Sequence, residues 1–355
     1  MSVFMGLDIG GANTKVCWVE MQNGRVVRAE GESVYHEVWR DPEGLQGVLE
    51  TFKYNREMGD DQTLQGVALT MTAELCDIFK SKSEGVRAIL DLVEQVFRDI
   101  PLYVWTTRGV FVSPSQTREK PLDAAAANWL ASATALARSP LVNHDEAAFL
   151  VDMGSTTTDI LPLFQGEVVV KGRTDLERLL YGELVYTGVL RTQVQAIVDY
   201  VHIKGLPCKV TSEYFSITAD VYRLLNLIRE EDYDVATPDG AGRDIAACVQ
   251  RLARVVASDP EEFGQNGVYA LARFIQEKQL QQVLDAVWQL LSRLEQPWPK
   301  RLIMASQGSF LLREVARRLE WEAIPWWECI PGAKEGYALT AYAVAWLLAG
   351  QLEVN

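Results

Sequence analysis

Two aspartates, each at the end of an apolar stretch, are the residues of this sequence best suited to chemistry. The first, Asp8, follows residues 3–7 and is itself followed by Gly10 and Gly11. Glycines in such a turn let the backbone come close to a phosphate, whose oxygens accept hydrogen bonds from backbone N–H groups. A carboxylate alone would repel the phosphate, so we predict that Asp8 binds Mg²⁺, directly or through water.

A second copy of the pattern lies in the middle of the chain. Residues 148–160 repeat the apolar stretch, the aspartate (Asp152), the glycine and a hydroxyl-rich turn. A single turn of this kind is a common connection between two strands and indicates little. Two copies with the same spacing predict a cleft lined by backbone amides, hydroxyls and two carboxylates. The offset that superposes the aspartates also superposes the residues after them, Gly10 with Gly154, Thr14 with Thr158 and Lys15 with Asp159.

The elements around the first turn follow from hydrophobic periodicity. Asn23 and Gly24 predict a tight turn between two strands, so the first copy lies in a hairpin-rich sheet. Strands and helices then alternate, which predicts an α/β sheet with helices packed on it. The expected strands are residues 66–70 and 101–105, and the expected helices are residues 44–54, 83–97 and 121–137.

The second half of the chain carries insertions of its own. We predict polar loops at 171–175 and 187–192, and a mostly helical region from 213 to about 277 that is interrupted at 237–240. A helix face at 280–294 is closed by Pro297, and residues 337–349 form a buried helix too short to span a bilayer. Strand 301–305 enters a turn at Gly308 and Ser309 before helix 310–319, and a helix start of this kind suits an anion or a base edge.

Length and composition set the broad class. A chain of 355 residues, 48% hydrophobic and 23% charged, predicts two globular domains. We place them at residues 1–140 and 141–355, with the mostly helical insertion at about 175–297. The net charge of −14 argues against nucleic acid and anionic membranes as partners, because no basic excess is present to neutralise phosphates.

The positions of the cysteines and histidines indicate which kinds of metal or catalytic site are not expected. The five cysteines are dispersed, which predicts reduced thiols in a cytoplasmic protein. The three histidines are far apart, so neither a zinc site nor a histidine-centred triad is expected. The N-terminal stretch has the pattern of a strand and not that of a charged segment followed by an apolar one, so we expect no signal peptide.

These motifs resemble the actin, sugar-kinase and Hsp70 superfamily, whose members have a two-domain α/β fold (actin-like, ribonuclease H-like) with duplicated phosphate turns and a central cleft. Within it, the chain resembles the hydantoinase/oxoprolinase-like family, and the branch that accompanies tetrahydromethanopterin-linked one-carbon metabolism and methanofuran biosynthesis. The stretches that resemble this branch in particular are residues 5–15, 70–77, 126–129, 152–160, 213–215 and 219–223.

The resemblance implies a transferase that joins an aminomethyl-furfuryl diphosphate to the phenol of a tyramine or tyrosine acceptor, glutamylated or not, and releases diphosphate. Asp8 and Asp152 would then hold Mg²⁺, Lys15 would neutralise the leaving group, and Asp159 would take the phenol proton. The residues then expected to bind phosphate or substrate are Gly10, Gly11, Asn13, Thr14, Gly154, Ser155, Thr156, Thr157, Glu74, Asn128, Gly308 and Ser309.

Several of these residues also have plainer interpretations. In these interpretations, Lys15 is only a solvated strand residue. Asp159, independently, only balances the charge of the cleft. Glu74 and Asp77 offset a helix dipole, and Asn128 packs in the core. Two loop cations, Arg173 and Arg191, guide an acidic acceptor tail or simply lie on the surface, and Gly308 and Ser309 form an old adenosine turn.

Three functions therefore stay open. The first is the ether-forming transferase with small-molecule partners, a diphosphate and a phenolic acceptor. The second is an ATP-dependent kinase or a hydantoinase/oxoprolinase-type ATPase, and the third is a non-catalytic nucleotide sensor. A homo-oligomer is compatible with the sequence, since Trp321, Trp326 and Trp327 either pack in the core or cover a partner surface.

Overall fold

Three antiparallel strands begin the chain and carry the first predicted turn. They are β1 (Ser2–Ile9), β2 (Asn13–Gln22) and β3 (Arg25–Tyr35). Asn23 and Gly24 both have positive φ values, 52° and 73°, as a tight turn between twisted strands requires. The predicted hairpin is confirmed.

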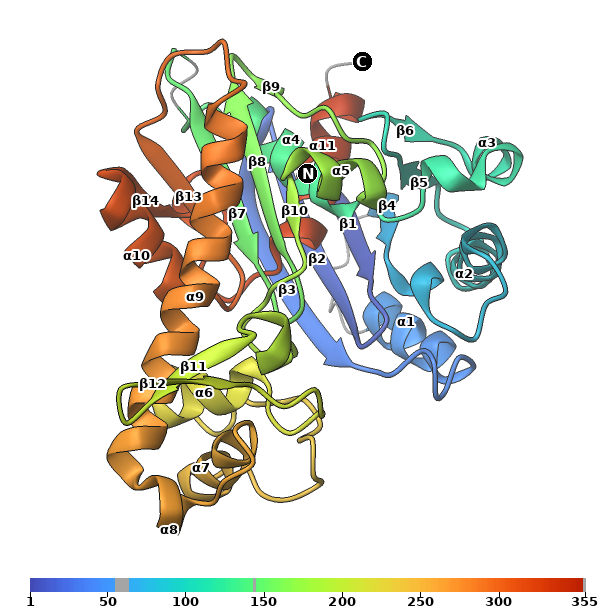
Figure 1. The fold of residues 1–355 in the computed structure, drawn as a ribbon. Helices are drawn as coiled ribbons and strands as arrows, with labels where there is room; N and C mark the ends of the chain where they lie inside the picture. The colour runs from blue at the N-terminus through green and yellow to red at the C-terminus, as the bar shows by residue number, and fades with distance from the viewer. Residues whose placement is uncertain (55–63, 143–144, 354–355) are drawn as a thin grey trace.

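The first sheet continues with parallel strands and is covered by two helices (Figure 1). The computed structural model describes residues 1–54, 64–142 and 145–353, so His144 lies outside it. The sheet has the order β3-β2-β1-β4-β5-β6. Its remaining elements are α1 (Gly44–Tyr54), β4 (Leu64–Met71), α2 (Lys82–Val96), β5 (Leu102–Trp105), β6 (Phe111–Val112) and α3 (Pro114–Glu119).

A second sheet repeats this plan. An antiparallel hairpin of β7 and β8 is extended on one side by the parallel strands β13 and β14 and on the other by the antiparallel strand β10. The order is β10-β8-β7-β13-β14. The predicted strand 301–305 and helix 310–319 are both confirmed. The elements are β7 (Ala148–Met153), β8 (Thr158–Phe164), β9 (Glu167–Val168), α5 (Asp175–Tyr181), β10 (Leu184–Val185), β13 (Arg301–Ala305), α10 (Ser309–Leu319) and β14 (Glu322–Pro325).

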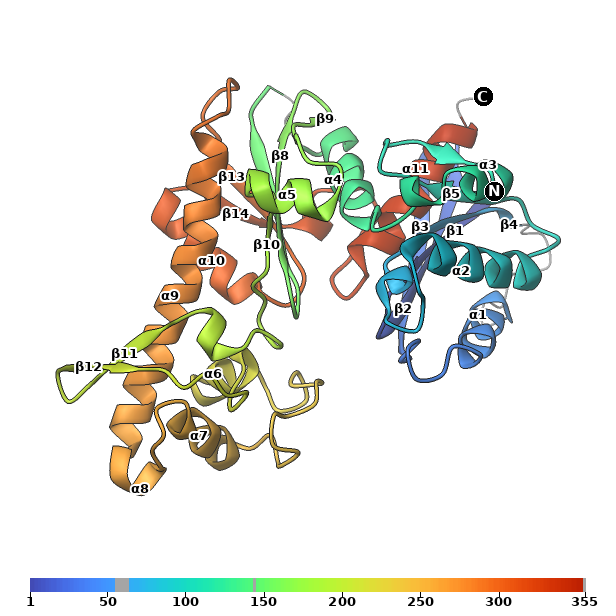
Figure 2. The ribbon, with the colours of Figure 1, turned by 45° about the vertical axis from the view of Figure 1, so that its right-hand side comes forward.

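Two apolar helices lie between the sheets and join them (Figure 2). The helix α4 (Asn128–Arg138) packs on β8 and β9, whereas α11 (Leu339–Glu353) returns to pack on β1, β2 and β4. The two helices also pack on each other, and Trp326 is buried in the core they share. Since Trp321 is buried in the core of the second sheet, the core interpretation is correct for both tryptophans.

An insertion between β10 and β13 occupies the lower left of Figure 1. A buried ion pair stabilises it, with Arg251 Nη2 2.7 Å from Asp220 Oδ1, and Arg251 also donates to Asp239 and to the Gly242 carbonyl. Its elements are β11 (Tyr200–Ile203), β12 (Leu206–Lys209), α6 (Thr218–Leu224), α7 (Ile245–Arg254), α8 (Pro260–Phe263) and α9 (Gln265–Leu291).

The helix predictions for this insertion were partly wrong. The interruption predicted at 237–240 is confirmed, but the loop without a helix is longer and spans residues 225–244. Within it the Arg251 guanidinium donates to Asp239 and to the Gly242 carbonyl. The helix predicted at 280–294 begins at Gln265 and ends at Leu291.

The helix predicted at 121–137 was wrong in its first half. Residues 121–123 form only one 3₁₀ turn, and α4 begins at Asn128. Ala126 has a φ of +48°, and its N–H donates to Glu74 Oε1 at 2.8 Å. Ala125 forms a parallel bridge with Met71 of β4, so contacts with the first sheet override the helix propensity of the alanines.

No helix in the described part of the chain has both the length and the apolarity needed to cross a membrane. The helix α11, which confirms the apolar helix expected near the chain's end, is instead buried between the sheets.

The contact between α11 and β1 should be intolerant of a single methyl group. A Cβ on Gly6 would lie 2.0 Å from the Ala341 carbonyl oxygen, so Gly6→Ala should lower the free energy of unfolding by about 1–3 kcal/mol or more. Gly47, in α1, has open space around it, and Gly47→Ala should raise stability by up to about 1 kcal/mol. Urea unfolding of both variants tests this, and equal effects would contradict the close packing.

Candidate active site at the two aspartate turns

Strand register gives the two turns the same geometry. Asp8 pairs with Lys15 across the β1–β2 hairpin, and Asp152 pairs with Asp159 across the β7–β8 hairpin. Each turn is closed by the same bond from a glycine N–H to the carbonyl three residues on. Gly10 donates to Asn13 at 3.0 Å, and Gly154 donates to Thr157 at 2.9 Å. The structure therefore repeats the motif in space as the sequence repeats it.

The turns also meet across the centre of the molecule. The pKa of Asp152 is raised to about 6. Burial is the main cause and the charges of Asp159 and Asp8 add to it, while a hydrogen bond from Ser306 and the charge of Lys15 act in the opposite direction. Lys15 lies on the other hairpin, so its field at Asp152 indicates that the two turns face each other. The structure thus brings together the predicted residues Asp8, Lys15, Asp152 and Asp159.

Lys15 is not simply a solvated strand residue. Its Nζ lies 3.1 Å from Asp8 Oδ2, and the side chain of Lys15 is 36% exposed, against 3% for Asp8. The carboxylates of Asp8 and Asp152 both raise the pKa of Lys15, against the lowering effect of burial. This ammonium group is therefore held charged between the two turns.

The donor set fits Mg²⁺. Asp8 Oδ1 is buried and has no hydrogen-bond partner among the described residues. The described residues contain no group of three or more His, Cys, Asp or Glu side chains that would enclose a metal ion. Mg²⁺ is usually held by one or two carboxylates, waters and substrate phosphates, and not by an all-protein cage. Asp8 and Asp152 would be its protein ligands here.

The remaining predicted turn residues line these two hairpins. Thr14 is buried, and its hydroxyl has no partner among the described residues. The Gly11 carbonyl accepts from the Val38 N–H at 2.9 Å, and the hydroxyls of Ser155 and Thr156 lie 3.4 Å apart.

Asp159 forms an ion pair with Arg178, a residue that the sequence analysis did not select. The Arg178 side chain is buried, and its guanidinium carbon lies 4.2 Å from the centre of the Trp129 ring. A capping box at Thr174 and Glu177 starts α5 and thereby positions Arg178. That capping box is the one signal in the sequence that would have located this helix.

Glu74 and Asn128 lie at one junction beside the first turn. Glu74 is buried in the 3₁₀ turn after β4, where one oxygen accepts from Ala126 and the other has no partner among the described residues. Burial raises the pKa of Glu74 to about 7. Asn128 is half-buried at the start of α4, and its role as a substrate ligand stays a prediction.

The turn at Gly308 and Ser309 belongs to the second hairpin. The Gly308 N–H donates to the Met153 carbonyl at 2.9 Å, and a Cβ on Gly308 would lie 2.6 Å from the Met153 side chain. Ser309 opens α10. In the same turn Ser306, with a φ of +63°, hydrogen-bonds Asp152, which the sequence analysis did not foresee.

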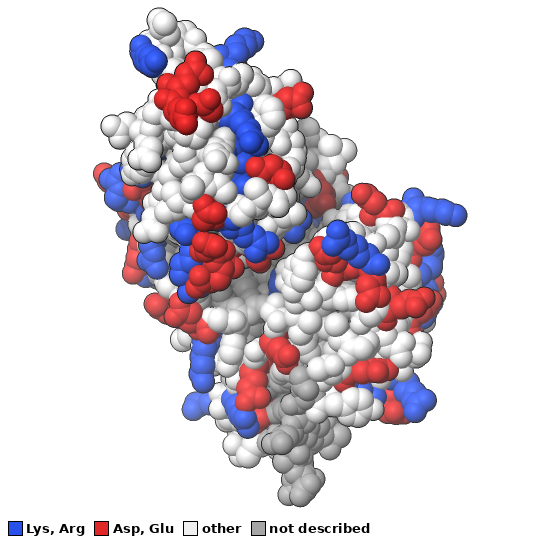
Figure 3. All heavy atoms as spheres, turned by 90° about the horizontal axis from the view of Figure 1, so that it is seen from below, with Lys and Arg blue, Asp and Glu red and all other residues white. Residues whose placement is uncertain are grey.

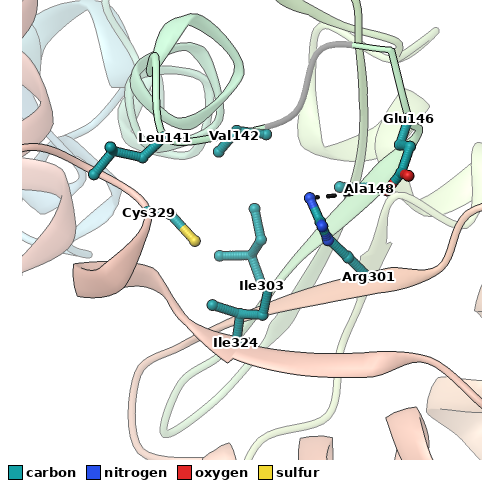
Figure 4. Close-up of a pocket in the computed structure, with 8 residues that line it drawn as sticks. All are labelled: Leu141, Val142, Glu146, Ala148, Arg301, Ile303, Ile324 and Cys329. Carbon is teal, nitrogen blue, oxygen red and sulfur yellow. Dashed lines mark ion pairs between the residues drawn. The ribbon is translucent and has the colours of Figure 1, made fainter.

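A small cavity at the opposite edge of the second sheet is not part of this site (Figure 4). It lies between Cys329 and the first residues of β7 and β13, Ala148 and Arg301, whereas Asp152 is at the other end of β7. Its volume of about 20 Å³ holds one water molecule. The aspartate turns stay the predicted functional site.

Removing the titration of Glu74 should change how stability depends on pH. The folded-state pKa is raised from 4.5 to about 7, so the folded protein binds more protons than the unfolded chain between these values. Wild-type stability should therefore fall, relative to Glu74→Gln, as the pH rises from 4.5 to 7, by up to about 3 kcal/mol. Urea unfolding across this range measures the difference, with Glu43→Gln as an exposed control. A difference independent of pH would contradict this.

Comparison with known proteins places these features in a family. Residues 65–345 match the hydantoinase/oxoprolinase family. The chain is 35% identical over 351 residues, 99% of both proteins, to the (4-{4-[2-(gamma-L-glutamylamino)ethyl]phenoxymethyl}furan-2-yl)methanamine synthase of Methanocaldococcus jannaschii. A protein of the same name from Methanococcus vannielii is 44% identical over 117 residues, which are 33% of this chain and 52% of that protein.

Comparison with solved structures finds similarities at low sequence identity. A polyphosphate/ATP-glucomannokinase from Arthrobacter sp. strain KM has a TM-score of 0.47 and 12% identity, covering 99% of this chain and 100% of that one. Nucleotide-free acetone carboxylase has a TM-score of 0.54 and 11% identity, covering 97% of this chain and 70% of that one. With the duplicated topology, the second likeness confirms the predicted actin-like α/β fold. By its matched residues and its full-length relative, the chain belongs to the hydantoinase/oxoprolinase family.

Proposed function

We propose that the protein is a transferase that forms an aryl ether between an aminomethylfuran and a γ-glutamylated tyramine. The observation that carries this proposal is the 35% identity over 99% of both chains to the Methanocaldococcus jannaschii synthase. The name of that relative's product describes a phenoxymethyl link to a furan that bears an aminomethyl group, with a γ-glutamylaminoethyl chain on the phenyl ring.

The reaction requires a leaving group on the furan CH₂, which we propose to be a diphosphate. The bond from CH₂ to the diphosphate oxygen breaks, and the oxygen keeps the electron pair. The phenol oxygen then forms the new C–O bond and loses its proton to a base. The electron-rich furan stabilises positive charge on the CH₂, so the protein has mainly to stabilise the departing anion and to align the phenol.

The residues at the turns suit these tasks. The Lys15 ammonium would offset the charge of the leaving group, and the backbone amides of Gly11 and Ser155 would donate to its oxygens. Mg²⁺ bound by Asp8 and Asp152 would supply further positive charge. Asp159 is occupied by its ion pair with Arg178, so its assignment as the base depends on the release of that pair.

Mg²⁺ should stabilise the folded protein through the two aspartates. At a Mg²⁺ concentration about 100 times the Kd, binding to the folded state alone adds about 2.7 kcal/mol. Asp8→Asn and Asp152→Asn should each lose most of this gain, whereas Asp99→Asn, whose side chain is exposed, should keep it. Thermal unfolding with and without Mg²⁺ gives the answer, and equal stabilisation of all four proteins would place the metal elsewhere.

Diphosphate release tests the reaction itself. Phosphorus NMR should detect acceptor-dependent release of diphosphate from an aminomethyl-furfuryl diphosphate in the presence of Mg²⁺ and γ-glutamyltyramine. Asp152→Asn should lower kcat/KM by about 10²-fold or more, and Asp99→Asn should not. No release in these samples, with loss of the γ-phosphate from ATP in a parallel one, would favour the kinase or ATPase function instead.

A further inference from the structure

The second aspartate turn is held by a loop that the proposed reaction does not use. This loop, residues 187–192, lies between β10 and β11, and we call it the support loop. Its Leu190 and Arg191 N–H groups both donate to the Ser155 carbonyl, at 3.1 and 2.8 Å. Since the carbonyl and the N–H of a trans peptide bond point in opposite directions, the next N–H, that of Thr156, points away from these two donors.

The support loop lies so close to the turn that no side chain fits between them. A Cβ on Gly188 would lie 2.4 Å from the Thr156 nitrogen and 2.6 Å from the Ser155 carbonyl oxygen. On the next residue, the Val189 N–H donates to the Gly154 carbonyl at 3.0 Å. The position of Gly188 therefore fixes the position of the peptide bond that joins Ser155 to Thr156.

The Ser155–Thr156 peptide bond is suited to bind an anion. Both residues are half-buried, and neither N–H donates to a group in the part of the chain that the structure describes. Successive free N–H groups in a turn form a concavity that binds phosphate oxygens. The molecule is hollowed between its two halves on the side that carries the insertion (Figure 3), so a small ligand has room between them.

A buried glutamine of the long helix α9 holds the support loop from behind. The Gln279 side chain is fully buried, and its Nε2 donates to the Gly188 carbonyl at 2.8 Å and to Thr187 Oγ1 at 2.9 Å. Thr218 Oγ1 donates to the same carbonyl at 2.9 Å, and Gln279 Oε1 accepts from the Tyr222 hydroxyl. Both N–H groups and the oxygen of the amide are thus used, which fixes its orientation.

An amide at this position differs from its surroundings. Gln279 is the only polar residue on the buried face of α9, whose other buried residues are Val, Leu, Ile and Ala. An apolar side chain of similar size would fill the core as well, and it would need no partners for polar atoms. What the amide adds is its set of hydrogen bonds to the support loop and to Tyr222.

We propose that Gln279 is a positioning residue for the diphosphate. This inference rests on the proposed function. Through Gly188, Gln279 holds the Ser155–Thr156 peptide bond where both N–H groups reach the oxygens of one phosphate. Gln279 lies behind the support loop and acts through it, without touching the substrate. The insertion, from which none of the predicted site residues comes, thereby completes a turn that belongs to the second sheet.

Calorimetric binding of inorganic diphosphate with Mg²⁺ to the full-length protein tests this inference. Gln279→Met nearly keeps the side-chain volume but removes both donors to the support loop, and it should raise the Kd for diphosphate about tenfold or more. Tyr222→Phe removes the third hydrogen bond of the same amide and should not change that Kd. Gln282→Met, whose amide on the same helix donates to the Ala196 carbonyl instead, should not change it either.

Two further measurements separate positioning from stability. Thr218→Val removes another donor to the Gly188 carbonyl and should raise the Kd in the same direction, which provides the test if Gln279→Met does not fold. In steady-state kinetics, Gln279→Met should raise the KM for the furfuryl diphosphate and leave the KM for the phenolic acceptor unchanged. A variant that is only less stable, but folded in the assay, would keep both KM values.

The outcomes that overturn the inference differ from those that overturn the reaction. An unchanged Kd in Gln279→Met and Thr218→Val, or equal increases in Gln279→Met and Tyr222→Phe, would mean that Gln279 only packs in the core. A wild-type protein that binds no diphosphate would also refute the inference. Binding of diphosphate without its release from the furfuryl diphosphate would refute the proposed reaction. The Kd comparison would then still decide the role of Gln279, because it needs no turnover.

Discussion

The packing of helix α11 against strand β1 is the constraint on which the rest of the structure depends. The backbone of Gly6 lies so close to that of Ala341 that no side chain fits between them. Because α11 follows the last strand of the second sheet, this contact fixes the second sheet relative to the first. The helix α4 packs on the second sheet, α11 packs on the first, and the two helices pack on each other. Together they form one core that both sheets share. The two aspartate turns consequently face each other in a defined way.

This fixed geometry brings carboxylates close to one another, and nearby cationic side chains reduce the resulting repulsion. The carboxylates of Asp8, Asp152 and Asp159 are brought together in a partly buried region, where like charges repel more strongly than in bulk water. Lys15 and Arg178 offset that charge in part, one for each hairpin. The raised pKa of Asp152 and the unpartnered oxygen of Asp8 indicate that the compensation is incomplete. A cation and a substrate with its own hydrogen-bond demands would complete it.

The hairpins are identical in register but differ in the residue that faces the aspartate. The first places a lysine there, and the second places an aspartate that needs an arginine from α5. The duplication therefore provides a symmetric frame, whereas its charges are asymmetric. An asymmetric site suits a reaction with one leaving group and one nucleophile, since the two ends of such a reaction need different charges.

The sequence by itself determined the features that depend on neighbours along the chain. The strand, aspartate, glycine and strand pattern fixes a hairpin whose register places Asp8 opposite Lys15, because the pairing follows from the length of the turn. Repetition of the pattern predicted the second hairpin. The spacing of apolar residues along the sequence predicted helices α1, α2 and α10, which cover the sheets.

The tertiary structure decided what depends on residues far apart in the chain. The Ala124–Ala127 run has high helix propensity, yet a hydrogen bond to Glu74, 52 residues away, holds Ala126 in a left-handed conformation. Arg178 reaches Asp159 only because α5 folds back over the second hairpin. Local spacing cannot predict such pairings, since their energies arise from burial and charge in a folded interior that the linear sequence does not contain.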